Sequence, residues 1–241
     1  MIRIDGRAAN ELRPIKITRK FIKYAEGSCL IEAGDTKVIC TASIDDKVPV
    51  WRKGVGSGWV TAEYGMIPRS CETRNPREIG RVMAGGRTLE IQRLVGRAIR
   101  SVVDLDALGE RTIWLDCDVI QADGGTRTAS VTGAFIAFVE AAALLKQQGV
   151  VKKIPITDVL AAVSVGVVQN EELLDLNYAE DSNASVDLNV VQTSAGRFVE
   201  IQGTAEGMPF SKNRLNKLLD LAEKGISEII VKVKECLADV L

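Results

Sequence analysis

The 241-residue sequence contains no histidine, which excludes every mechanism built on imidazole, including Ser-His-Asp triads and HExxH zinc sites. Its five cysteines are odd in number and show no CxxC spacing. Reduced thiols are therefore expected in place of disulfides or a zinc site, and we expect the protein to be cytoplasmic.

Long hydrophobic runs are also lacking. The N-terminus has no apolar segment of the kind that a signal peptide requires. The longest mainly apolar stretch, residues 133–145, is shorter than the roughly 20 residues of a membrane span and contains Glu140. The sequence therefore predicts no transmembrane helix and no membrane partner.

The composition is otherwise that of an ordinary globular protein, with 46% hydrophobic and 26% charged residues. This excludes the disordered and coiled-coil classes. The length fits one large domain or two small ones. Because no Pro- or Ser-rich linker divides the chain, residues 1–241 are predicted to form a single domain.

Charge is unevenly distributed, although the net charge is only −1. Residues 1–127 hold 21 Lys and Arg against 17 Asp and Glu, whereas residues 128–241 hold 10 against 15. Fifteen of the 17 arginines lie in the first part. A surface rich in arginine suits phosphate recognition, because the guanidinium fork matches two oxygens at once. The alternative is a solvated helix face that forms ion pairs.

Hydrophobic periodicity predicts both strands and helices. Strands are expected at residues 28–33, 36–44, 59–67, 112–120, 159–168, 173–177, 185–193 and 197–202, with a hairpin turn at residues 34–35. Helices are expected at residues 87–103 and 130–148 and from the N-cap Ser211 onwards, with Gly225 as a candidate break. Residues 69–84 are expected to form an exposed loop. This order predicts an α+β domain with mixed sheets and packed helices.

Two glycine–arginine segments precede predicted helices and are candidate anion sites. The first is DGGTR at residues 123–127 and the second is GGR at residues 85–87. Glycine allows close backbone approach to a ligand, and a helix N-terminus favours an anion. Thr126 adds a hydroxyl donor, while Arg127 and Arg87 add full charges. The alternative is a glycine turn with Thr126 as N-cap and solvated arginines.

An acidic pair, Asp181 and Asp187, is a candidate Mg²⁺ site. In a strand over residues 185–193, Asp187 and Asn189 face the same side, within reach of Asp181 from the preceding turn. Hard oxygen ligands of this kind suit Mg²⁺, which also binds substrate phosphates. The alternative is a solvated acidic turn.

Several blocks of the sequence closely resemble the ribonuclease PH family, and they span nearly the whole chain. They are RIDGR at residues 3–7, ELRP at 11–14, GDTKV at 34–38, TAEY at 61–64, GRTLEIQR at 86–93, DCDVIQADGGTRT at 116–128, ED at 180–181 with Asp187, and FVEIQGT at 198–204. The resemblance implies the fold of ribosomal protein S5 domain 2.

The same resemblance implies a phosphate-dependent 3′→5′ exoribonuclease, a tRNA nucleotidyltransferase, which acts on tRNA precursors and other RNA 3′ ends. It implies Mg²⁺ as cofactor, inorganic phosphate as co-substrate, and a homohexamer built as a trimer of dimers. The resemblance also implies roles for individual residues. Phosphate is bound by Arg87, Gly125, Thr126 and Arg127, and RNA is bound by Arg69, Arg74 and Arg77. Asp181 and Asp187 bind the metal, and these two aspartates and Arg127 are the catalytic residues.

Two other functions remain open at this point. A catalytically inactive, RNA-binding ring subunit of an exosome-like assembly would tend to lose acidic or phosphate-binding residues, whereas Arg87, Arg127, Asp181 and Asp187 are all present here. A hydrolytic metal-dependent nuclease would have little use for two anion sites. Whether an aspartate acts as general acid or only as metal ligand also stays open.

Overall fold

The computed structural model of the chain describes residues 3–77 and 85–241. Its elements follow in this order: β1 (Ile15–Arg19), β2 (Gly27–Ala33), β3 (Thr36–Asp45), a 3₁₀ turn (Val50–Arg52), β4 (Trp59–Met66), α1 (Gly86–Arg100), α2 (Leu105–Leu108), β5 (Thr112–Gln121), α3 (Thr126–Gln147), β6 (Leu160–Val168), β7 (Glu171–Leu174), α4 (Tyr178–Asp181), β8 (Val186–Thr193), β9 (Phe198–Ala205) and α5 (Lys212–Cys236).

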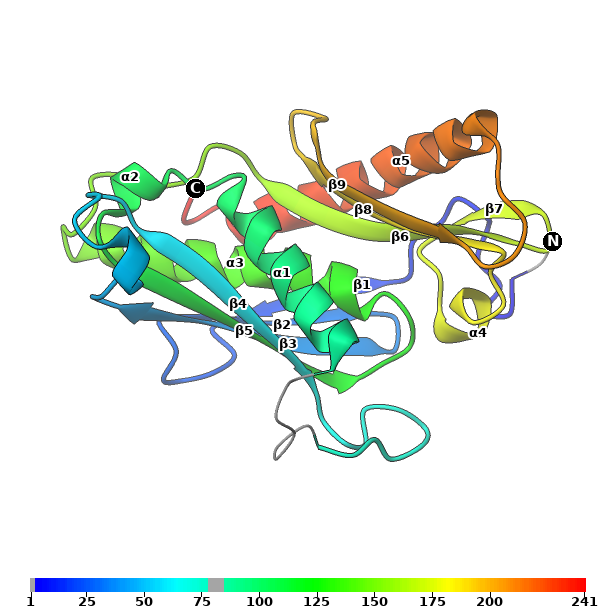
Figure 1. Cartoon of the computed structure of the whole chain (residues 1–241), viewed down its shortest axis with the longest axis horizontal. Coiled ribbons are helices and arrows are strands. Elements are labelled where there is room, and N and C mark those ends of the chain that lie inside the picture. The colour runs from blue at the N-terminus through cyan, green and yellow to red at the C-terminus, as the bar shows by residue number, and fades with distance from the viewer. Residues whose placement is uncertain (1–2, 78–84) are drawn as a thin grey trace.

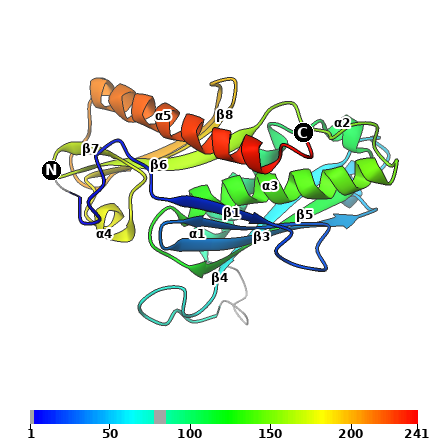
Figure 2. The same cartoon turned by 180° about the vertical axis from the view of Figure 1, so that it is seen from behind.

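These elements stack in four layers (Figures 1 and 2). A five-stranded sheet with the order β1-β2-β3-β5-β4 is followed by a layer of α1 and α3. A four-stranded sheet with the order β7-β6-β8-β9 is next, and α5 covers its other face. Among the described residues only β4 and β5 pair in parallel, and α1 connects them. The predicted α+β class with mixed sheets is therefore confirmed.

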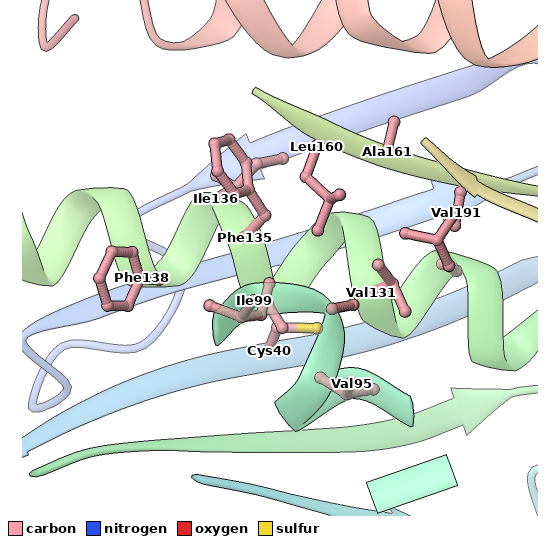
Figure 3. Close-up of a cluster of buried hydrophobic side chains, with 14 of the residues drawn as sticks. Cys40, Val95, Ile99, Val131, Phe135, Ile136, Phe138, Leu160, Ala161 and Val191 are labelled. Atoms are coloured by element: carbon pink, nitrogen blue, oxygen red, sulfur yellow. The ribbon is translucent and has the colours of Figure 1, made fainter. Parts of the chain in front are cut away.

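Helix α3 lies at the centre of the core, between the two sheets (Figure 3). Every residue from 128 to 142 is buried. Figure 3 shows side chains of α3 among residues of α1 and of both sheets, namely Val131, Phe135, Ile136 and Phe138 with Val95, Ile99, Cys40, Leu160 and Val191. A helix that is packed on all sides can be apolar all round, which explains its sequence.

Helix α3 begins at Thr126, four residues before the predicted start, and is therefore longer than expected. By length and hydropathy α3 is long and apolar enough to cross a membrane, although the apolar stretch at residues 133–145 was judged too short for a span. However, 89% of its most apolar window is buried inside the fold. Contacts with two sheets of the same chain account for its apolar composition.

Most predicted elements are present with ends shifted by a few residues, including the hairpin between β2 and β3. The predictions missed β1 and the short helices α2 and α4. Helix α5 continues through Gly225, which was predicted as a candidate break. Glycine is needed here for packing, because a Cβ at this position would lie 2.6 Å from Cδ1 of Leu174. Strand β7 ends at Leu174, since Asp175 has a positive φ of 53°.

Candidate active site

The turn between β5 and α3 forms the centre of the candidate site. Gly124 and Gly125 have φ values of +70° and +64°. A Cβ on Gly124 would lie 2.5 Å from the carbonyl oxygen of Leu176, so this position accepts only glycine. Gly125, not Thr126, is the N-cap, and no side chain caps the helix. The N–H groups of its first turn are therefore available to an anion.

The N-terminus of α1 has the same character. Its N-cap is Gly85, without a side-chain cap and without an acidic residue in the first turn. Tyr64 of β4 connects the two helix ends, since its hydroxyl lies 2.9 Å from Oγ1 of Thr126 and accepts a hydrogen bond from Arg87. Burial raises the pKa of Tyr64, against the opposing effect of these hydrogen bonds. The two glycine–arginine segments thus converge.

Both acidic residues lie beside these helix ends. Asp187 is on β8, and Asp181 is the last residue of α4. Partial burial and the charge of Asp187 raise the pKa of Asp181, whereas the charges of Arg127 and Arg87 act in the opposite direction. The strand register supports this placement, because Asp187 points to the same face of the sheet as Gln202, and Gln202 accepts a hydrogen bond from Arg127 at 2.6 Å. Oδ1 of Asp187 is buried and has no hydrogen-bond partner among the described residues.

Helix α4 holds Asp181 in place although it is only one turn long. Asn177 and Glu180 form a capping box at its start. Glu180 also accepts two hydrogen bonds from the buried Arg3, at 2.7 and 2.6 Å. Oδ1 of Asp123 accepts from the backbone N–H of Tyr178 at 3.0 Å. The position of α4 is therefore tied to the turn that precedes α3.

Arg13 stabilises the turn between β5 and α3 through buried hydrogen bonds. Its Nε and Nη2 donate to the two carboxylate oxygens of Asp175 at 3.0 and 2.7 Å, and its Nη1 donates to the carbonyl oxygen of Asp123. Burial disfavours ionisation of Asp175, but the hydrogen bonds and charge of Arg13 hold its pKa below the usual value. The pair therefore remains charged inside the protein and fixes the glycine turn.

Arg69, Arg74 and Arg77 are placed on the loop that follows β4. All three are exposed, and none forms an ion pair or hydrogen bond with the rest of the described chain. The carbonyl oxygen of Ser70 accepts from the backbone N–H of Ala122 at 2.8 Å, which anchors the loop next to the β5–α3 turn. The predicted loop is confirmed over residues 69–77, and its residues 78–84 lie outside the described part.

Sequence patterns missed the residues that support this site. Tyr64, Arg13 and Arg3 contact partners that are 62, 162 and 177 residues away in the chain. Local spacing therefore contains no signal for these pairs. Their only trace in the sequence is that they lie within the blocks that carry the family resemblance, without a role being implied for them.

The fold and this site define a class of protein. Residues 11–143 match the model of domain 1 of the 3′ exoribonuclease family, and residues 158–225 match the model of its domain 2. The chain therefore belongs to the 3′ exoribonuclease family.

Individual relatives sharpen this assignment. Over all 241 residues the chain is 59% identical to proteins named ribonuclease PH from Bacillus mycoides (strain KBAB4) and Bacillus cereus (strain G9842), and it covers 98% of each. The resemblance drawn from the sequence is thus confirmed.

The fold is also similar to that of a chain in the Archaeoglobus fulgidus exosome with RNA bound to the active site. The TM-score is 0.80, with 23% identity, over 95% of this chain and 92% of that one. The expected fold is therefore confirmed.

Proposed function

We propose that the chain is a phosphate-dependent 3′→5′ exoribonuclease that removes terminal nucleotides from tRNA precursors and other RNA 3′ ends and releases nucleoside diphosphates. One observation carries this proposal: two uncapped helix N-termini, Arg87 and Arg127 converge beside the carboxylates of Asp181 and Asp187. An inactive ring subunit would not require all four side chains to meet, so that alternative is not favoured.

The chemistry joins two anions. An oxygen of hydrogen phosphate attacks the terminal phosphodiester, and the bond from phosphorus to the preceding 3′ oxygen breaks. That oxygen gains a proton and becomes a hydroxyl, and the proton that the attacking hydrogen phosphate loses balances the reaction. At ~4 Å and an effective dielectric constant of ~20, two unit charges repel each other by about 4 kcal/mol. Arg87, Arg127 and the helix ends offset this repulsion and align the reactants.

The missing histidine is compatible with this reaction, because phosphate arrives already ionised and needs no imidazole base. The product is a nucleoside diphosphate, which retains an anhydride bond. We therefore expect the reaction to run in both directions.

Asp181 and Asp187 would hold Mg²⁺. The described residues contain no group of three or more His, Cys, Asp or Glu side chains suited to a metal. Two carboxylates are nevertheless enough for Mg²⁺, which completes its shell with water and substrate phosphates. The unpartnered Oδ1 of Asp187 fits a ligand role. Bound there, the ion would neutralise charge on phosphate oxygens and assist departure of the 3′ oxygen.

RNA would run along the loop that carries Arg69, Arg74 and Arg77. These exposed guanidiniums are adjacent to the phosphate site through the contact between Ser70 and Ala122. Contacts of arginine with phosphates give affinity without sequence readout, and they weaken as salt concentration rises.

The proposed assembly is a homohexamer, a trimer of dimers. Several large apolar side chains are exposed in the single chain, among them Val50 (91%), Trp51 (64%) and Val55 (62%). Exposed apolar surface of this kind is typical of protein–protein contacts. The structural neighbour named above is part of an exosome. Light scattering should give about six times the chain mass of 26.1 kDa.

A single-domain organisation and a cytoplasmic location complete the proposal. One hydrophobic cluster includes residues of both sheets and of α1, α3 and α5. This favours one cooperative unit, which a single calorimetric transition would test. All five cysteines lie in the described part of the chain and are free, as is usual in a reducing compartment.

The decisive experiment is incubation of RNA bearing a 3′ tail with Mg²⁺, with and without inorganic phosphate. We expect nucleoside diphosphates only when phosphate is present. Nucleoside monophosphates formed without phosphate would identify a hydrolytic nuclease instead. If neither product forms, although the RNA binds, the chain is an inactive RNA-binding subunit.

A further inference from the structure

Arg127 is held from one side by two residues to which no role has been given above. Its Nη1 donates to Oε1 of Gln202 on β9 at 2.6 Å. The same Nη1 lies 3.5 Å from Oε2 of Glu90, one turn into α1. Gln202 in turn donates from Nε2 to Oε1 of Glu90 at 2.9 Å. The three side chains thus form a closed triangle between α1, α3 and β9.

This triangle permits only one orientation of the Gln202 amide. Its carbonyl oxygen must accept from the guanidinium of Arg127, which has no acceptor. Its NH₂ group must donate to the carboxylate of Glu90, which has no donor. In the reversed orientation, the NH₂ group of Gln202 would face the N–H groups of Arg127, and its carbonyl oxygen would face the carboxylate of Glu90. Neither contact would be a hydrogen bond. Glu90 therefore fixes the amide, and the amide fixes Arg127.

The contacts with Gln202 and Glu90 use one end of the guanidinium and leave a whole edge for a ligand. Within residues 3–77 and 85–241, neither Nε nor Nη2 of Arg127 makes a hydrogen bond. Nε and Nη2 form the edge that binds two oxygens at once. Arg13 shows the same geometry, because its Nε and Nη2 bind both oxygens of Asp175.

Gln202 is also placed beside the acidic pair. It is the register partner of Asn189 on β8, and Thr204, two residues further along β9, is the register partner of Asp187. Partners in an antiparallel pair point to the same face of the sheet. The contact with Gln202 therefore sets the position of Arg127 relative to the carboxylate of Asp187.

We propose that Glu90 and Gln202 are positioning residues for phosphate binding: together they hold Nη1 of Arg127 so that its Nε–Nη2 edge faces two oxygens of the attacking phosphate. This inference rests on the proposed function, because it takes Arg127 as a phosphate ligand. Holding the side chain in advance lowers the entropy lost when phosphate binds. Neither Gln202 nor Glu90 is placed against the reacting atoms, so we expect the contact to act mainly on the KM for phosphate.

The chain contains a matched control pair on the same two elements. Arg97 of α1 and Glu200 of β9 form an ion pair at 2.5 Å, seven residues along α1 from Glu90 and two residues along β9 from Gln202. This pair also joins α1 to β9 but does not contact Arg127. A purely structural effect of joining the two elements should therefore appear in Glu200→Ala as well.

The experiment measures phosphorolysis at saturating RNA over a range of phosphate concentrations. For Gln202→Ala and Glu90→Ala we expect the KM for phosphate to rise about tenfold, as for loss of a hydrogen bond to a charged group, with kcat changed less than about twofold. Glu90→Gln keeps an acceptor for Gln202 and should recover most of the loss. Glu200→Ala should retain the KM of the unaltered protein.

Two results would overturn the inference: an unchanged KM in both Gln202→Ala and Glu90→Ala, or an equal rise in Glu200→Ala. Calorimetric titration of the intact protein with inorganic phosphate gives the same ranking without catalysis. If the unaltered protein binds phosphate but releases no diphosphate, the proposed function fails while the binding constants of the variants still decide this inference. If it binds no phosphate, both fail.

Discussion

Charged side chains serve opposite purposes in two adjoining regions of this molecule. Beneath the glycine turn, Arg3, Arg13, Asp175 and Glu180 are each at most 5% exposed, and every one is paired. We call this set the buried network. Above the turn, Arg87, Arg69, Arg74 and Arg77 are exposed and form no ion pair with the described residues, and Oδ1 of Asp187 has no partner. We call this set the open site.

The difference shows that residue type alone does not identify a phosphate site. The excess of arginine in residues 1–127 suggested a surface for phosphate, but Arg3, Arg7, Arg13 and Arg19 bind carboxylates of the same chain. Arginines whose charge is already compensated attract an added anion weakly. At the two helix N-termini, Arg87 forms no ion pair with the described residues, and the contacts of Arg127 within the described residues use only its Nη1, so both arginines are available to a ligand.

The largest effect is expected for Asp187→Asn, in the open site. Activity should fall by about 10³-fold, because a charged group at the reacting centre is lost. Stability should be unchanged or slightly higher, since Oδ1 of Asp187 is buried and finds no hydrogen-bond partner in the described part of the chain. Phosphorolysis assays and urea unfolding measure both. Activity near that of the unaltered protein would remove Asp187 from the metal site.

For Arg13→Ala, in the buried network, the main expected effect is a loss of stability. It leaves Asp175 buried and uncompensated, so the free energy of unfolding should fall by about 3–5 kcal/mol. The double variant with Asp175→Asn should regain part of this loss, because no buried charge remains. Urea unfolding tests both variants. Equal stability of Arg13→Ala and the unaltered protein would mean that the pair contributes nothing to the fold.

Arg127, which lies beside the open site, should affect phosphate use far more than stability when it is replaced by alanine. We expect kcat/KM for phosphate to fall by about 10²–10³-fold, with a higher phosphate requirement and a lower turnover. RNA affinity should change little, and the free energy of unfolding should fall by only about 1 kcal/mol, because Gln202 loses one hydrogen-bond partner. An unchanged dependence of the rate on phosphate concentration would count against a phosphate-binding role.

Replacing Arg69, Arg74 and Arg77 together by alanine should affect RNA binding alone. Three phosphate contacts on a single strand predict that the slope of log affinity against log salt decreases by about 2. Anisotropy of a labelled RNA measured from low to moderate salt would show this change. A slope equal to that of the unaltered protein would mean that the three arginines form only a solvated surface.

The smallest effect concerns the pH dependence of stability. The folded pKa of Asp175 lies below its unfolded value, so the pair with Arg13 contributes fully above about pH 4 and is lost as pH falls further. Below that pH, Asp175→Asn should lose stability less steeply than the unaltered protein, by at most about 1.4 kcal/mol per pH unit. Urea midpoints at several pH values measure the difference, and parallel curves would contradict it.

Much of the fold could be predicted because its signals are local. The periodicity of α1 and α5, the Gly34 hairpin and the alternation of β8 each depend on residues that are close in sequence. Boundaries were less accurate where tertiary contacts decide them. Helix α3 starts at Thr126 because the Asp123 turn is held by Arg13. Such long-range support leaves no periodic pattern.

By itself, the sequence determined which chemistry was available to this protein: no imidazole, two glycine–arginine helix starts and a pair of aspartates, all in blocks that resemble one family. Only the tertiary structure decided which charges are open to a ligand. Arg13 and Arg127 look alike in sequence, but the first is neutralised by Asp175 and the second keeps the edge formed by Nε and Nη2 unpaired. The physical reason is that charge compensation depends on distance in space, and the compensating carboxylate lies 162 residues away in the chain.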